Sequence, residues 1–193
     1  MSLDAAIEEF PKTIRLKDGL ACELRPLEVT DESAFLAFFQ AVPDRERMFI
    51  KHRVTEQPVI REWCQNIDLG RILPLLAIHD GKIIGDAALH QSLGGWKRHI
   101  GRISVLVHPQ YRGRGIAKTL VGDLLSIARH IGLEKVEAEF IGGQEQAIQT
   151  FGLLGFTTLM RLPDYVKDMQ AISHDYVLMG LDLKTDEEYA GMA

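Results

Sequence analysis

The sequence has few of the features that mark secreted, membrane-spanning or zinc-binding proteins. It contains two cysteines in 193 residues, Cys22 and Cys64, which lie far apart and lack the spacing of metal ligands, so neither a disulfide framework nor a metal site is predicted. No apolar run approaches the roughly 20 residues needed to cross a bilayer. The first ten residues carry acids where a signal peptide would carry basic residues. We therefore expect a cytoplasmic protein without a membrane partner.

An excess of positive charge is also lacking. The formal net charge is −5 at pH 7, which predicts no general affinity for nucleic acid or for an anionic membrane surface. Any anion that the protein binds must then be held by a local site. The composition, with 46% hydrophobic and 25% charged residues, is that of a soluble globular protein. We expect a single domain over 1–193, with an N-terminal extension over 1–12 and a frayed tail over 184–193.

Hydrophobic periodicity and turn residues predict a mixed α/β domain. Asp18-Gly19 and Asp80-Gly81 are hairpin signals, and each separates two short runs with strand character. One helix is predicted from Thr30, as its N-cap, to Pro43, and a second over 55–66 with Thr55 as N-cap and a proline in its first turn. The expected elements that follow the second hairpin are a strand over 102–107, a helix over 116–131, a strand over 135–141, a short helix within 144–156, and strands over 156–162 and 173–183.

The segment "VHPQYRGRGIAKTL" at 107–120 is a glycine-rich turn between a predicted strand and a predicted helix, which is where backbone N–H groups converge on a phosphate. A Walker A loop is excluded because Arg112 and Ala117 stand where its two glycines should be. A dinucleotide fingerprint would use Gly113 and Gly115, but Lys118 occupies its third glycine position. The pattern [RQ]-x-x-G-x-[GA] is matched in order by Arg112, Gly115 and Ala117.

That third pattern is the pyrophosphate loop of the GNAT superfamily of N-acetyltransferases, which the chain resembles over roughly 21–183. The strand "ISVLV" before the loop, the long helix after it, and "KVEAEFIGGQEQAIQTFGLLGF" downstream are similar to the family's elements at their usual spacing. The resemblance implies an α/β fold with a central, mostly antiparallel twisted sheet, flanked by about four helices. It also implies that the strand Ile103–Val107 splays from its parallel neighbour at Val136–Ile141 and leaves a slot.

The resemblance implies acetyl-CoA as cosubstrate. Backbone amides of the loop would surround the pyrophosphate, the cations Arg112, Arg114 and Lys118 would add charge, and unpaired strand groups would bind the pantetheine amides and the acetyl oxygen. For each of the three cations, a solvated surface position is the alternative. The predicted cofactor-binding residues are Val105, Leu106, Val107, Arg112, Gly113, Arg114, Gly115, Ile116, Ala117, Lys118, Gln144 and Phe151.

The catalytic groups depart from the family's pattern. Phe151 stands where many relatives have the tyrosine that protonates the departing thiolate, so the thiolate either leaves unaided or receives a proton from Tyr165 or Tyr176. No carboxylate lies on the strand before the loop. Glu139 is the first choice for the base; Glu137, His90 and Asp86 are alternatives, and a solvent-facing position on a strand edge is the competing interpretation for each.

The predicted function is transfer of an acetyl group from acetyl-CoA to a primary amine of an unidentified acceptor, by direct attack within a ternary complex. The replacement at Phe151 motivates an alternative from another class, a non-catalytic acyl-CoA-binding sensor or interaction module. Hydrolysis of a nucleotide is a third, weaker hypothesis. A homodimer is a further expectation, because dimers are common among the relatives that the resemblance implies.

Overall fold

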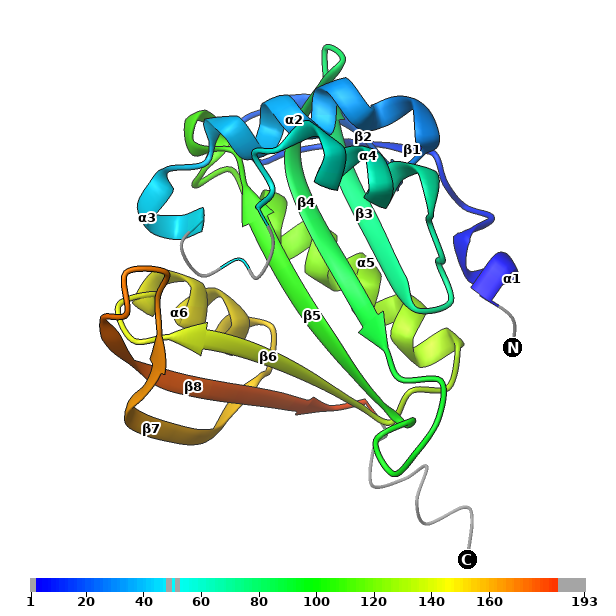
Figure 1. The fold of residues 1–193 in the computed structure, drawn as a ribbon. Coiled ribbons are helices and arrows are strands. Elements are labelled where there is room, and N and C mark those ends of the chain that lie inside the picture. The colour runs from blue at the N-terminus through cyan, green and yellow to red at the C-terminus, as the bar shows by residue number, and fades with distance from the viewer. Residues whose placement is uncertain (1–2, 48–49, 51–52, 184–193) are drawn as a thin grey trace, which may run out of the picture.

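The computed structural model describes residues 3–47, 50 and 53–183. Its strands form one eight-stranded sheet in the order β1-β2-β3-β4-β5-β6-β8-β7 (Figure 1). The strands are β1 (Lys12–Arg15), β2 (Ala21–Pro26), β3 (Ile72–His79), β4 (Lys82–Gln91), β5 (Ile100–Val107), β6 (Lys135–Ile141), β7 (Thr157–Lys167) and β8 (Ser173–Asp182). The helices are α1 (Leu3–Ile7), α2 (Glu32–Ala41), α3 (Asp44–Arg47), α4 (Gln57–Gln65), α5 (Ile116–His130) and α6 (Glu145–Leu153), with 3-10 turns η1 (Val29–Asp31) and η2 (Pro109–Tyr111).

The sheet is antiparallel except where β5 meets β6. These two strands pair in parallel at Ile100 with Lys135, Gly101 with Val136, and Arg102 with Glu137. Beyond that point they diverge, and β5 continues with β4 as its partner while β6 continues with β8 (Figure 1). The predicted mixed sheet with a splayed parallel pair is therefore confirmed.

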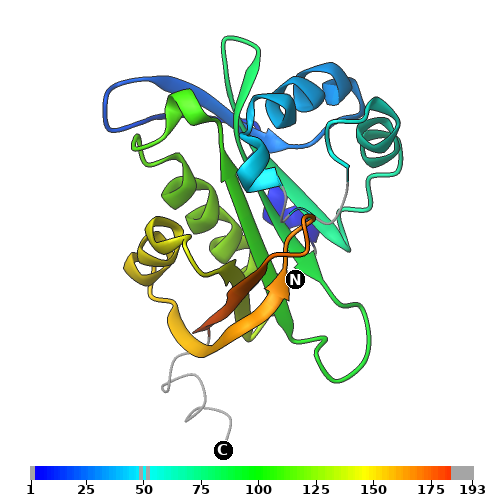
Figure 2. The same ribbon diagram turned by 60° about the vertical axis from the view of Figure 1, so that its left-hand side comes forward.

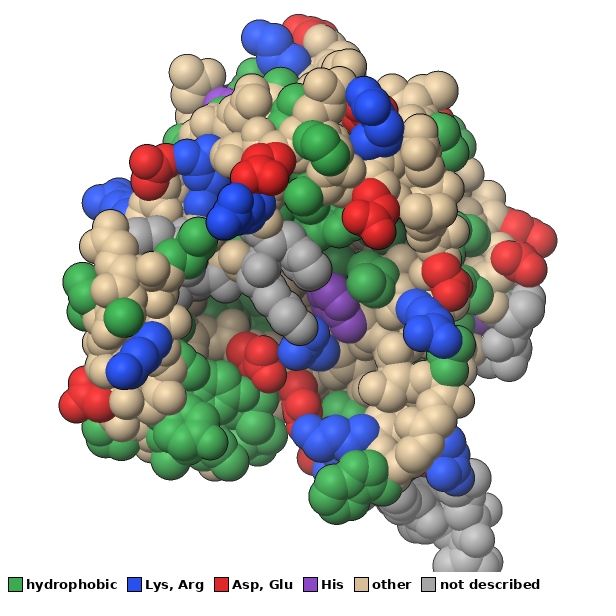
Figure 3. Space-filling view, in the orientation of Figure 1, with side chains coloured by type: hydrophobic (Ala, Val, Ile, Leu, Met, Phe, Trp, Pro, Cys, Tyr) green, Lys and Arg blue, Asp and Glu red, His purple; other side chains and the backbone are tan. Residues whose placement is uncertain are grey.

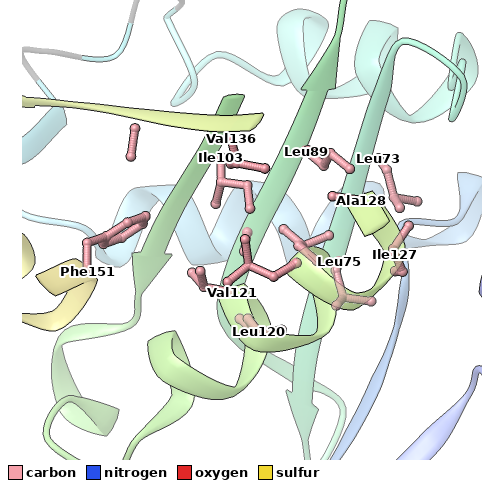
Figure 4. Packing of buried hydrophobic residues seen from close by; sticks show 14 of the residues in the cluster. Leu73, Leu75, Leu89, Ile103, Leu120, Val121, Ile127, Ala128, Val136 and Phe151 are labelled. Carbon is pink, nitrogen blue, oxygen red and sulfur yellow. The ribbon is translucent and has the colours of Figure 1, made fainter. Parts of the chain in front are cut away.

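Helices cover both faces of the sheet. Figure 2 shows α5 and α6 on one side and α2 and α4 on the other. The larger hydrophobic cluster lies between α5 and strands β3–β5, where Leu120 and Val121 of α5 pack near Leu75, Leu89 and Ile103 (Figure 4). A smaller cluster holds α2 and α4 against the opposite face through side chains that include Phe38 and Ile60. Every helix that faces the sheet thus buries an apolar stripe.

The predicted hairpins and the long helix are confirmed, but both predicted N-caps are wrong. Thr30 lies inside η1, and α2 begins after Asp31, whose carboxylate is held by Arg25 and by the N–H of Glu28. Helix α4 begins after Glu56 instead of Thr55, although Pro58 does lie in its first turn. The short helices α1 and α3 were not predicted, because four or five residues carry too little periodicity. The predicted tail over 184–193 lies outside the described residues.

Candidate active site

The loop after β5 has the backbone of an anion site. Gly113 and Gly115 have φ of 77° and 90°, a left-handed conformation that favours glycine. Gly115 is the N-cap of α5, and its carbonyl accepts the N–H of Thr119 at 3.0 Å. The N–H groups of the first three residues of this 15-residue helix, 116–118, have no acceptor within the helix. The helix dipole strengthens their attraction for a negative group. The loop therefore has the main-chain geometry that phosphate-binding loops at helix N-termini use.

Two arginines of this loop are already paired with carboxylates from distant segments. Arg112 donates two hydrogen bonds to Glu46 of α3, at 3.0 and 2.7 Å, and its Nε donates to the Val107 carbonyl at 3.3 Å. Arg114 is paired with Asp18 of the first hairpin and lies over the ring of Tyr111, 5.3 Å from its centroid. The third cation, Lys118, is exposed. A bound phosphate would compete with Glu46 and Asp18 for the two guanidinium groups.

The predicted slot lies beside this loop. Val105, Leu106 and Val107 pair with β4 on one side, and β6 has no pairing with them on the other. Gln144 closes the end of β6, because its side-chain oxygen accepts the N–H of Ile141 at 3.0 Å. The edge of β5 at 105–107 therefore has no strand partner on this side among the described residues, as the addition of a strand-like ligand would require.

Phe151 is placed differently from the other predicted cofactor residues. Its side chain is 1% exposed, and its ring lies 5.0 Å from that of Phe140 and 4.9 Å from that of Phe156 in edge-on contacts. The side chain is part of the hydrophobic core, and the structure gives it no exposed surface for a ligand. Three aromatic rings that pack together stabilise one another, so this position serves packing.

A polar network lies where β5 and β6 separate. Glu139 of β6 accepts hydrogen bonds from Arg102 of β5 at 3.3 Å and from the hydroxyl of Tyr176 of β8 at 3.2 Å. His90 of β4 lies 3.4 Å from the hydroxyl of Ser104. Figure 3 shows a hollow on this face of the molecule, bordered by acidic, basic and histidine side chains. The structure thus brings two of the predicted candidates, Glu139 and His90, to neighbouring positions on one face.

Several groups on this face have shifted pKa values. Burial raises the pKa of Tyr176 to about 12, and the neighbouring Glu139 adds to the shift by its charge and its hydrogen bond. Burial lowers the pKa of His90, and Arg102 lowers it further, while Glu139 opposes them. Burial raises the pKa of Asp86 to about 7. The buried Oδ1 of Asp86 has no hydrogen-bond partner within the described part of the chain, and the residue lies opposite Leu106 in the sheet.

Some members of the site gave no usable signal in the sequence. Glu46 and Asp18 precede the loop by many residues, and only the fold brings them to its arginines. Ser104 could have been found, because two-residue alternation places it on the same strand face as Arg102. Its contact with His90 depends on the β4–β5 register, in which His90 lies opposite Arg102.

Comparison with known proteins agrees with this geometry. A family model described as "Acetyltransferase (GNAT) family" matches residues 37–156. Glucosamine 6-phosphate N-acetyltransferase of Trypanosoma brucei brucei is 37% identical over 153 residues, which covers 73% of this chain and 92% of the relative. L-amino acid N-acyltransferase MnaT of Escherichia coli (strain K12) is 24% identical, covering 67% of this chain and 76% of the relative.

Solved structures share the fold. The ribosomal-protein-S5-alanine acetyltransferase of Vibrio fischeri has a TM-score of 0.76 at 15% identity and covers 90% of this chain and 97% of its own. The structure of yncA from Salmonella typhimurium, which contains its cofactor acetyl-CoA, has a TM-score of 0.71 at 20% identity and covers 85% and 95%.

The chain therefore belongs to the GNAT acetyltransferase family. It is an acyl-CoA-dependent N-acetyltransferase, and acetyl-CoA is its cosubstrate. Among the helices that the structure describes, none is long and apolar enough to span a membrane.

Proposed function

We propose that the protein acetylates the primary amine of a small acceptor by direct attack on acetyl-CoA within a ternary complex. The observation that carries this proposal is the separation of β5 from β6 after Arg102 and Glu137, directly before the glycine-rich loop. The glycine-rich loop then follows the separated end of β5, and the polar face around Glu139 lies where the separation begins. A donor thioester and an amine can meet there from opposite ends.

The proposed cofactor contacts come from three places. Main-chain N–H groups from Arg112 to Lys118 hold the pyrophosphate, with Gly113 and Gly115 allowing its close approach. The free edge of β5 at Val105, Leu106 and Val107 binds the pantetheine, and a strand N–H stabilises the negative charge that develops on the acetyl oxygen. Gln144 contributes its side-chain amide, which lies at the end of β6.

The reaction forms a bond between the amine nitrogen and the acetyl carbon and breaks the carbon–sulfur bond. A protonated amine cannot attack, so the site must remove a proton from it. We propose Glu139 for this role. It lies two residues beyond Glu137, the last β6 residue that pairs with β5, and its contacts with Arg102 and Tyr176 fix the orientation of its carboxylate.

The acceptor is proposed to be a small amine that also carries an anionic group. By their names, the two curated relatives act on an amino sugar phosphate and on amino acids, and both substrates fit that description. On this chain, Arg102 lies beside Glu139 and Lys97 lies beside Glu137. These two cations can bind the anionic group of the acceptor while the carboxylates bind its amine.

Calorimetric titration followed by thiol release tests the proposal. Acetyl-CoA and free coenzyme A should bind, and ATP should not. Thiol release should then appear with one member of a panel containing glucosamine 6-phosphate, L-amino acids and a peptide with an N-terminal alanine. Binding without thiol release on a broad amine panel would favour the sensor, and absence of binding would overturn the cofactor site.

We also propose a cytoplasmic homodimer. Strand β7 lies at the edge of the sheet and exposes Leu159, Met160 and Tyr165 by 56%, 44% and 66%. An exposed edge with large apolar side chains is a surface that a second copy can cover. Sedimentation at micromolar concentration should give a dimer, and Leu159→Lys should convert it to a monomer; a monomeric wild-type protein would contradict the proposal.

A further inference from the structure

A proton donor is needed if coenzyme A is to leave as a neutral thiol, and the usual position cannot supply that proton. Phe151 has no ionisable proton and is buried in the core. Tyr111 packs in the phosphate loop against Arg114. Tyr165 of β7 is 66% exposed, and none of the hydrogen bonds among the described residues joins it to Glu139. Among the tyrosines that the structure describes, Tyr176 is the one whose hydroxyl is joined to the proposed base.

The contacts of Tyr176 connect it to the place where the strands separate. Its hydroxyl donates to Oε1 of Glu139 at 3.2 Å, while Arg102 donates to Oε2 of the same carboxylate at 3.3 Å. Arg102 is the last residue of β5 that pairs with β6. The carboxylate and the phenol therefore lie together where the two strands separate, and a hydrogen bond from the phenol joins them.

We propose that Glu139 and Tyr176 form a proton relay, in which Glu139 takes a proton from the attacking amine and Tyr176 gives its hydroxyl proton to the departing thiolate. This proposal rests on the proposed function. The ammonium proton of the acceptor first passes through Glu139 to solvent, which leaves a neutral amine and an ionised carboxylate. One N–C bond then forms and one C–S bond breaks, a proton of the attacking amine moves to Glu139, and the phenol proton moves to sulfur. Glu139 then returns its proton to the phenolate through their hydrogen bond. The products are an amide and a neutral thiol, and both residues regain their starting states.

The charge of Glu139 controls the acidity of Tyr176, and it changes at the step at which Tyr176 must donate its proton. Besides burial, the groups that act on the pKa of Tyr176 are Glu139 and Glu137 on β6, which raise it, and Arg102 on β5, which lowers it. The ring of Tyr165 on β7 packs against that of Tyr176, with 5.9 Å between the ring centroids. When Glu139 accepts the amine proton, its negative charge disappears. Tyr176 then becomes a stronger acid at the step that needs one.

The first test does not depend on activity. The ultraviolet absorbance of tyrosinate is titrated in the wild type, and the curve of Tyr176→Phe is subtracted to isolate Tyr176. In Glu139→Gln the pKa of Tyr176 should fall below its wild-type value, because the carboxylate charge is gone. A pKa of Tyr176 that does not move in this variant would overturn the electrostatic coupling and with it the relay.

The second test separates chemistry from binding. Tyr176→Phe should lower kcat by about 100-fold, within the range of one general acid, while calorimetric affinity for acetyl-CoA stays unchanged. Tyr165→Phe is the matched control and should stay within about threefold. The double variant Tyr176→Phe/Glu139→Gln should lose little more than either single variant, because the two residues act as a unit.

The outcomes distinguish the relay from the reaction itself. A wild-type kcat in Tyr176→Phe, or additive losses in the double variant, would refute the relay while leaving acetyl transfer intact. If the wild type binds acetyl-CoA but releases no thiol with any amine, the proposed function fails. The tyrosinate titration then still reports whether Glu139 and Tyr176 are coupled.

Discussion

The ion pair between Glu46 and Arg112 gives a direct prediction about cofactor affinity. The two side chains are 25% and 39% exposed and make a two-pronged contact, so the pair contributes about 1 kcal/mol at most. A phosphate that uses the Arg112 guanidinium must displace this carboxylate. Glu46→Gln removes the competing charge and should therefore strengthen acetyl-CoA binding by up to about 1 kcal/mol, which is roughly fivefold in Kd.

Calorimetry at low ionic strength measures the effect, which should shrink as salt is added. Glu56→Gln is a matched control, because Glu56 pairs with Arg53 on an exposed surface and neither residue belongs to the loop. Its Kd should equal that of the wild type. Weaker binding in Glu46→Gln would refute the reasoning and would mean that Glu46 positions Arg112 for the cofactor instead of competing for it.

Three further variants test the described contacts. Burial raises the pKa of Asp86 to about 7, so the folded state loses stability as pH rises from about 4 to 7. Asp86→Asn should therefore be more stable than the wild type at pH 8, by about 2 kcal/mol in urea unfolding. Gly115→Val, at φ 90°, should cost about 2 kcal/mol and abolish acetyl-CoA binding in calorimetry, whereas Gly122→Ala, in the middle of α5 with open space around it, should keep binding. Asp31→Asn should cost about 2 kcal/mol in the same unfolding assay, because it removes the carboxylate that makes two 2.7 Å hydrogen bonds with the largely buried Arg25 and leaves only the more exposed Glu23 and Glu28 beside it.

Local sequence signals predicted most of the fold. Asp80 and Gly81 both adopt positive φ, as a tight hairpin between β3 and β4 requires. The Asp-Gly pair predicts that turn without any tertiary information. The end of α5 at Gly132, with φ 84°, follows from the same rule for glycine. Such features depend on a few adjacent residues, so periodicity and turn chemistry suffice to find them.

The helix starts and the contacts of the site were not predictable in this way. Thr30 is a residue type that favours the N-cap, but Asp31 is held by Arg25 at the end of β2, a 3-10 turn forms over Val29–Asp31, and α2 begins after Asp31. The sequence showed that Phe151 occupies the position of the family's tyrosine, but it did not show that its ring packs against Phe140 and Phe156. That packing depends on how α6 lies on the sheet. Local propensity cannot determine contacts that tertiary structure creates.

The internal pairing of the loop arginines decides how the protein can recognise a polyanionic cosubstrate. A chain with net charge −5 has no long-range field that attracts such a ligand, and Glu46 and Asp18 already neutralise Arg112 and Arg114. In the proposed cofactor contacts, the main-chain N–H groups at the start of α5 and the exposed Lys118 then supply the attraction for the pyrophosphate. Because these dipoles act at short range, the affinity of the wild type should depend only weakly on salt, and the dependence should steepen in Glu46→Gln, where one guanidinium is released to the ligand.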